Sequence, residues 1–86
     1  MNNIILVKAK RNLFKPNGGP FTWNNKFYKL EYLAHKYYKY QFRVRNMSGK
    51  ITGYWTSQEA PEVDKDFNNL FRIICQGEAD EKRICA

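Results

Sequence analysis

The side chains best suited to bind a ligand in this chain are arginines and lysines that alternate with aromatic rings. Arg43 and Arg45 lead this set, because a guanidinium binds phosphate through two hydrogen bonds and stacks on bases, whereas a lysine acts as a point charge. Aromatic rings stack on bases in proteins that bind single strands. Trp55 is either such a ring or part of the core. The predicted nucleic-acid-binding residues are Lys10, Arg11, Lys15, Lys36, Tyr37, Lys39, Arg43, Arg45, Lys50 and Tyr54.

The charge is divided unevenly along the sequence. Residues 1–58 contain eleven basic residues and one acid, Glu31, together with twelve of the fourteen aromatic residues. Residues 59–86 have a net charge of −3, so the whole chain carries +7. A strongly basic segment favours a polyanionic partner, with nucleic acid first and an acidic protein or membrane surface next. The alternative interpretation is that the rings are strand core and the lysines form the solvated side of the sheet.

Residues suited to catalysis are few. His35 is the only histidine, and with Glu31 and Arg43 or Arg45 it could supply the base, acid and cation of a small ribonuclease. The more common role for such a histidine is an exposed turn. The chain has no glycine-rich phosphate loop followed by Lys and Ser or Thr, and no serine or cysteine nucleophile beside a histidine. We therefore expect a protein that is not an enzyme and that needs no cofactor.

The two cysteines, Cys75 and Cys85, are too few for the disulfide framework of a small secreted domain, so we expect both to be reduced. A bridge that closes ten residues near the C-terminus is the alternative. No metal site is expected, because structural zinc needs four ligands and His35 lies far upstream. The apolar run at residues 4–7 is too short for a signal peptide or a membrane helix. These features predict a soluble cytoplasmic protein with no membrane partner.

Residues 1–58 have the alternation expected of a β-sheet. In residues 38–45, one side of the expected strand carries Tyr38, Tyr40, Phe42 and Val44, and the other side carries Lys39, Gln41, Arg43 and Arg45. The pair Asn24-Asn25 predicts a hairpin between residues 21–23 and 26–30, since asparagine tolerates a positive φ. The five expected strands are 4–10, 21–23, 26–30, 38–45 and 51–56, with a loop at 12–20 and a hairpin turn at 46–50.

Beyond residue 60 the apolar period changes to that of a helix. The apolar stripe consists of Val63, Phe67, Leu70, Phe71 and Ile74. Pro61 suits the first position of a helix and Gly77 suits its end, so we predict a helix over residues 61–77. Residues 78–86 form either a tail or a short edge strand at 83–85.

These elements predict one small α+β domain over residues 1–86, an antiparallel sheet of four or five strands with one C-terminal amphipathic helix packed on one face. The other face stays open and carries the cations. An open cationic sheet favours single-stranded RNA, because flat sheets present stacking rings between phosphate-binding side chains. Duplex DNA is less favoured, since the expected helix begins with acids and no second, basic helix is available for the major groove.

In size, in its basic first two-thirds and in its aromatic content, the chain resembles small phage-encoded inhibitors of host defence. It is similar in kind to the T4-type inhibitory factor of the ribonuclease toxin ToxN. The resemblance implies an RNA-binding protein that joins a host ribonuclease toxin to RNA and blocks it without catalysis. Other phage inhibitors, including anti-CRISPR proteins, look equally similar. A protein-only inhibitor, whose basic face occupies an acidic or nucleic-acid-binding site of its target, therefore stays open as the alternative.

Overall fold

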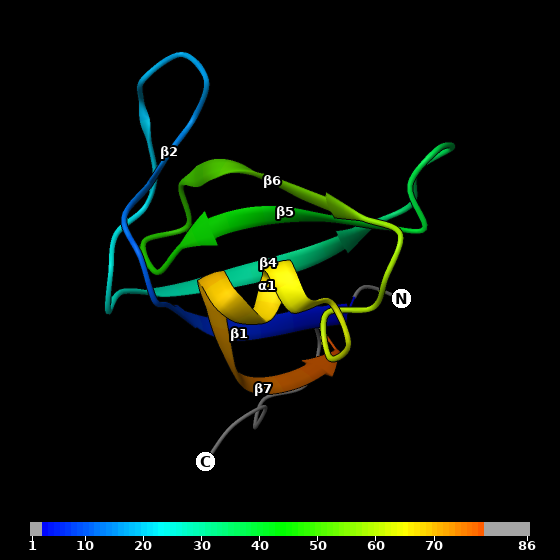
Figure 1. Cartoon of the computed structure of the whole chain (residues 1–86). Helices are drawn as coiled ribbons and strands as arrows, with labels where there is room; N and C mark the ends of the chain where they lie inside the picture. Colours follow the sequence, from blue (N-terminus) through cyan, green and yellow to red (C-terminus); the bar gives the residue numbers. More distant parts are fainter. Residues whose placement is uncertain (1–2, 79–86) are drawn as a thin grey trace.

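The computed structural model describes residues 3–78 and is built on a five-stranded antiparallel sheet with the order β6-β5-β4-β1-β7. The helix α1 lies against one face of this sheet, and a two-stranded sheet of β2 and β3, here called the arm, projects from it (Figure 1). The α+β character of the chain is thus as predicted. The bounds of the elements are Asn3–Ala9 (β1), Leu13–Phe14 (β2), Pro20–Thr22 (β3), Phe27–Leu33 (β4), Tyr40–Asn46 (β5), Ile51–Ser57 (β6), Lys65–Leu70 (α1) and Phe71–Glu78 (β7).

Alternating apolar side chains form the core between the sheet and α1. On β5, Phe42 and Val44 are buried, as the period of two predicts. Ile5, Val7 and Ala9 of β1 are buried in the same way. Antiparallel pairing aligns these rows, because directly opposed residues share one face of a sheet. The other buried hydrophobic residues are Tyr28, Leu30, Phe67 and Phe71.

The predicted helix over 61–77 is wrong in length. The helix α1 begins after Asp64, whose side chain accepts hydrogen bonds from the backbone N–H groups of Asp66 and Phe67, and the backbone becomes extended at Phe71. The chain then pairs with β1, so that Ile73 lies opposite Val7. Two consecutive β-branched isoleucines favour a strand, and β1 offers an edge with which that strand can pair.

The helical stripe was misleading because its two phenyl rings are buried in either conformation. Phe67 ends up on α1 and Phe71 at the start of β7, with their ring centroids 5.0 Å apart. Leu70 also packs against the core, but Val63 is 64% exposed and Ile74 is 40% exposed. Gly77 lies opposite Ile4 within β7 and does not end a helix.

The predicted hairpin of residues 21–23 and 26–30 is also wrong, although its turn is present. Asn25 has the expected positive φ of 68°. However, β3 pairs with β2, whereas β4 pairs with β1 and β5. The turn is held to the end of β1, where Asn25 N–H donates to the carbonyl of Ala9 and Ala9 N–H donates to that of Lys26. Residues 12–20, expected to form a loop, therefore contribute to the arm.

The arm contacts the edge strand β6 at a glycine. A Cβ atom on Gly53 would lie 2.7 Å from the Phe21 ring, which is too close for any larger residue to stand there without a shift. The missing side chain thus lets β3 approach β6. The turn between β5 and β6 follows the prediction, with Gly49 at a positive φ of 93° and Asn46 Oδ1 accepting from the N–H groups of Ser48 and Lys50.

Cys75 is disulfide-bonded, which contradicts the predicted reduced thiol. The cysteine count argues against a framework of several bridges, but it does not exclude a single one. Cys85 and the edge strand proposed at 83–85 lie outside the described residues. Within residues 3–78, no helix has the length and apolar character that crossing a bilayer requires.

Candidate nucleic-acid interface

The sheet face opposite α1, here called the open face, brings together basic residues from four strands. Strand pairing places Arg43 opposite Glu31, Arg45 opposite Lys29, and Lys8 opposite both Phe27 and Arg72. Residues in direct opposition point the same way, so these side chains share one surface. Glu31 is the one acid among its described side chains. The five cations of this face are Lys8, Lys29, Arg43, Arg45 and Arg72.

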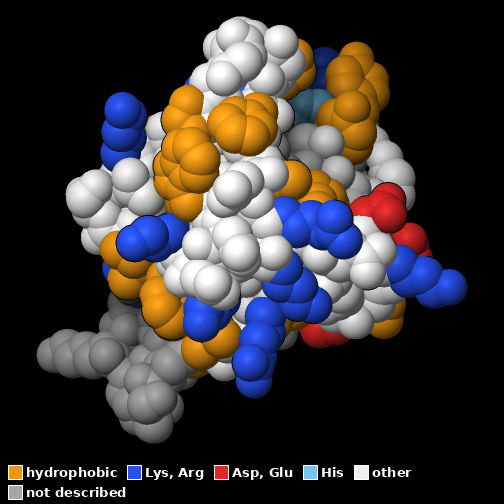
Figure 2. Space-filling view, turned by 60° about the vertical axis from the view of Figure 1, so that its left-hand side comes forward, with side chains coloured by type: hydrophobic (Ala, Val, Ile, Leu, Met, Phe, Trp, Pro, Cys, Tyr) orange, Lys and Arg blue, Asp and Glu red, His pale blue; other side chains and the backbone are white. Residues whose placement is uncertain are grey.

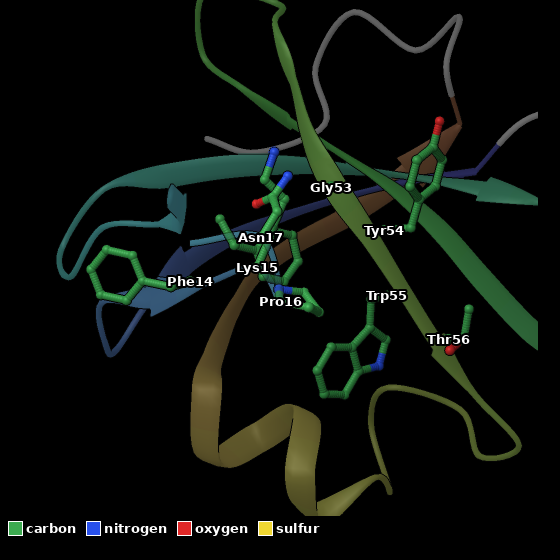
Figure 3. Close-up of a pocket in the computed structure, with 9 residues that line it drawn as sticks. Phe14, Lys15, Pro16, Asn17, Gly53, Tyr54, Trp55 and Thr56 are labelled. Carbon is green, nitrogen blue, oxygen red and sulfur yellow. The ribbon is translucent and has the colours of Figure 1, made fainter. Parts of the chain in front are cut away.

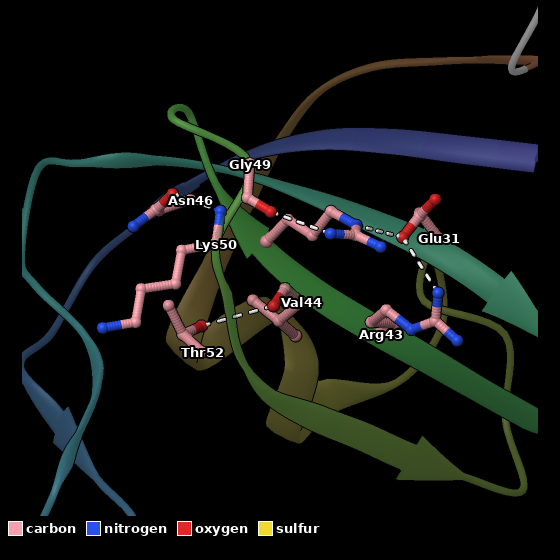
Figure 4. A network of polar contacts seen from close by, with 8 residues as sticks. Glu31, Arg43, Val44, Asn46, Gly49, Lys50 and Thr52 are labelled. Carbon is pink, nitrogen blue, oxygen red and sulfur yellow. Dashed lines mark hydrogen bonds and ion pairs between the residues drawn. The ribbon is translucent and has the colours of Figure 1, made fainter.

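Glu31 holds the two predicted arginines against the sheet (Figure 4). Arg45 Nε donates to Glu31 Oε1 at 2.6 Å, and Arg45 Nη1 donates to the carbonyl of Gly49 at 2.8 Å. Arg43 Nη1 lies 3.8 Å from the same Glu31 oxygen. Both guanidinium side chains are about one-third exposed, at 32% for Arg43 and 31% for Arg45. The pair is therefore pre-positioned and accessible, but one of its two charges is balanced.

Tyr54 is the predicted stacking ring that lies on the same face as Arg43 and Arg45. It lies opposite Arg43 on β6 and is 53% exposed. Trp55, the next residue, points the other way, toward α1 (Figure 3). Its ring meets Phe67 edge-on at 5.7 Å and Phe71 at 6.0 Å. Trp55 is thus part of the core, the second of its two expected roles.

Three predicted residues lie at another end of the sheet. Lys36, Tyr37 and Lys39 are exposed in the loop 34–39 that joins β4 to β5. This loop and the turn 47–50 are at opposite ends of β5 (Figure 1). Gln58 fixes the loop, since its side chain donates to the carbonyl of Tyr37 and accepts from Lys39 N–H. The structure therefore does not unite these residues with the arginines into a single cluster.

Lys10 and Arg11 follow β1 and lie beside α1. Lys10 Nζ donates to the carbonyl of Asn68 at 2.6 Å, and Lys10 N–H donates to the carbonyl of Leu70. Both bonds satisfy carbonyls at the C-terminal end of the helix, where a cation is favoured. Arg11 lines a hollow together with Asp66. These two residues are thus separate from the open face.

Lys15 and Lys50 meet in a groove between the arm and the end of the sheet, here called the arm groove. Its volume is about 530 Å³, and it is also lined by Lys26 and by the rings of Trp23 and Phe27. These two residues are 46% and 42% exposed, respectively. None of its described lining residues is acidic. Figure 2 shows this end of the molecule, with basic side chains spread among hydrophobic ones.

A second hollow lies between the arm and β6 and is mainly apolar (Figure 3). It has a volume of about 660 Å³ and is lined by Phe14, Phe21, Tyr54 and Trp55, among others, with Lys15 as its one basic residue. The ring of Phe14 is 58% exposed and meets Trp23 edge-on at 5.7 Å. This hollow suits an apolar group better than a phosphate.

The residues of the alternative ribonuclease site are engaged elsewhere. His35 Nδ1 accepts hydrogen bonds from the N–H groups of Tyr37 and Tyr38, at 3.0 and 3.3 Å. Glu31 instead contacts Arg45 and Arg43. Thus His35 organises its own turn, the role that the sequence favours, while Glu31 serves the open face.

The predicted set lacks Lys8, Lys29 and Arg72 of the open face and Lys26, Trp23 and Phe27 of the arm groove. Lys29 alternates with buried Tyr28 and Leu30, so a strict reading of the period of two could have found it. Arg72 was hidden by the assignment of its segment to a helix. Lys26 and Trp23 come together with Lys50 through the arm, and no local pattern predicts that contact.

Neither a metal-binding group among the described residues nor a match to a known protein assists the assignment. Among residues 3–78, no group of three or more His, Cys, Asp or Glu side chains is placed to hold a metal ion. Comparison with protein-family models, with curated proteins and with solved structures found no match. Function must therefore be inferred from the geometry of this chain.

Proposed function

We propose that this protein is a non-catalytic RNA-binding module that holds single-stranded RNA on the open face of its sheet. The observation that carries the proposal is the strand register, which aligns cations from β1, β4, β5 and β7 on one face with a single acid among the described side chains. Each phosphate that these cations neutralise releases counterions, which favours binding at low salt.

The side chains of Arg43, Arg45 and Tyr54 suit a single strand of RNA better than a duplex. Arg43 and Arg45 provide forked donors for phosphate oxygens, and exposed Tyr54 beside Arg43 provides a ring for a base. Many proteins that bind a duplex place a basic helix in its major groove. The helix α1 has six residues and carries Asp66 in its first turn. These features favour an unpaired strand over a duplex.

The two arginines should account for a measurable part of RNA binding. We expect Arg43→Ala combined with Arg45→Ala to weaken binding of a fluorescent single-stranded RNA and to lower the salt slope by up to about two. Titrations at several salt concentrations, with single-stranded RNA, single-stranded DNA and duplex DNA, measure both quantities. Glu31 loses its partners in this variant, but a partly exposed ion pair contributes only about 1 kcal/mol or less to stability.

The matched control is Lys36→Ala combined with Lys39→Ala, which removes the same charge from the loop 34–39. We expect this control to keep most of the affinity. Equal losses in the two double variants would show that net charge, and not the open face, governs binding. Absence of RNA binding by the wild-type protein at low salt would contradict the proposal itself.

An inhibitor of a host protein is the second candidate, and the apolar hollow beside the arm favours it. Aromatic anchors are common in binding hot spots, and Phe14 and Tyr54 provide exposed rings at this hollow. The target would be a ribonuclease toxin or another defence protein with an acidic or nucleic-acid-binding site. Co-purification from host cells after nuclease treatment tests this function, since a partner that survives treatment does not depend on RNA.

A further inference from the structure

The arm groove has the residues of a nucleotide site. Lys15 comes from the arm, Lys26 from the turn before β4, and Lys50 from the turn before β6. Three separate segments thus bring cations to one hollow of about 530 Å³, which is within the range of about 300–1,000 Å³ typical of ligand pockets. Phosphate charge is favoured there because the described lining contains no acid.

The position of Trp23 is fixed without its ring being buried. The backbone N–H of Trp23 donates to Tyr28 Oη at 2.7 Å, and the backbone carbonyl of Trp23 accepts from the backbone N–H of Lys26 at 3.1 Å. The edge-on contact with Phe14 supports the ring from one side, yet 46% of the residue stays exposed. A large ring held in this way can stack on a base at little entropic cost.

The groove and the open face are continuous. Phe27 lines the groove and also lies on the open face, with Lys8 Nζ 5.7 Å from its ring centroid. Asn46 and Met47 line both the groove and a smaller hollow of about 310 Å³, whose lining also includes Arg45, Lys29 and Glu31. One strand of RNA can therefore pass from the arginines over Met47 into the groove.

We propose that the arm groove binds an unpaired base of the same RNA strand, stacked on Trp23, while Lys15, Lys26 and Lys50 hold the adjacent phosphates. This inference rests on the proposed function, and it adds the path of the strand around the end of the sheet. Stacking tolerates any base, so the groove has little sequence preference.

Replacement of the ring tests the site directly. Trp23→Ala should weaken binding of an oligouridylate by about five-fold or more, the equivalent of the lower end of the stacking energy of one base. The matched control is Tyr37→Ala, which removes a ring that is 75% exposed at the other end of the sheet and should change affinity little. An oligomer of the same length with abasic positions separates stacking from charge. Wild-type protein and Trp23→Ala should bind it equally.

Fluorescence gives a second measurement. The chain has two tryptophans, so Trp55→Phe leaves Trp23 as the sole reporter, and oligouridylate should quench its emission. Should Trp55→Phe fail to fold, wild-type protein is compared with Trp23→Phe, in which the quenching should be lost.

The outcomes distinguish the two proposals. Unchanged affinity of Trp23→Ala, while the double arginine variant still loses affinity, overturns the groove and leaves the open face standing. No binding of RNA by wild-type protein at low salt overturns both. A nuclease-resistant protein partner that is lost in Trp23→Ala would assign the groove to that partner and overturn its role in RNA binding.

Discussion

At the scale of single residues, Glu31 determines how much of the charge of Arg43 and Arg45 is available to a phosphate. Its Oε1 atom lies 2.6 Å from Arg45 Nε and 3.8 Å from Arg43 Nη1. A phosphate that binds the arginines must compete with this carboxylate. Glu31 also orients them, since a guanidinium held by one oxygen keeps fewer rotamers.

We therefore expect Glu31→Gln to strengthen RNA binding and to steepen its salt dependence by up to about one. The amide still accepts a hydrogen bond from Arg45 but no longer balances its charge. Loss of stability should be about 1 kcal/mol or less, because all three side chains are partly exposed. Salt-dependent titration and thermal unfolding measure the two effects. Weaker RNA binding by Glu31→Gln would mean that the ion pair is needed to position the arginines.

At the scale of elements, β7 distinguishes the observed fold from the helix that the sequence predicts over residues 61–77. In β7, Ile73 lies opposite Val7 and packs against the core, whereas Ile74 is 40% exposed at an irregularity in the pairing. A helix over residues 61–77 would reverse the two, with Ile74 on the apolar stripe and Ile73 beside it.

Ile73→Ala should thus destabilise the protein by roughly 2 kcal/mol or more, as removal of a core isoleucine does, while Ile74→Ala should cost about 1 kcal/mol or less. Denaturant unfolding of the two variants measures the difference. A larger loss of stability in Ile74→Ala than in Ile73→Ala would support the helix over residues 61–77. In that case Arg72 would not belong to the open face.

The sequence predicts those elements whose signals are local. The alternation in β5 and the Asn46–Gly49 turn depend on a few neighbouring residues, and both are found. Phe67 and Phe71 satisfy a helical spacing and also an α1–β7 junction, so local pattern cannot separate the two. The choice depends on β1, which is distant in sequence and provides the pairing edge for β7. The pattern of apolar residues alone therefore cannot predict this part of the fold.

The same distinction applies to the candidate site. Arg43, Arg45 and Tyr54 are predictable because they belong to one hairpin. Lys8 and Arg72 join them only through the register of β1 with β4 and β7. Lys39 was predicted to share the strand face of Arg43 and Arg45, but β5 begins only at Tyr40, so Lys39 lies in the loop with Lys36 and Tyr37. A strand of seven residues separates this loop from the turn 47–50.

At the scale of the whole molecule, the acids of residues 59–66 and the cations of the open face lie on different sides of the sheet. The acids of residues 59–66 belong to the segment that leads into α1 and to α1 itself, which lies against the covered face (Figure 1). The open face has five cations and one acid among its described side chains. This arrangement orients the positive potential toward an incoming polyanion and away from the helix.

Titration of the isotope-labelled protein with oligouridylate, followed by backbone amide chemical shifts, tests the central claim most directly. We expect the largest changes in β4, β5 and β6 around Glu31, Arg43, Arg45 and Tyr54, continuing into the turn 47–50. Changes confined to α1 or to the loop 34–39 would contradict binding on the open face.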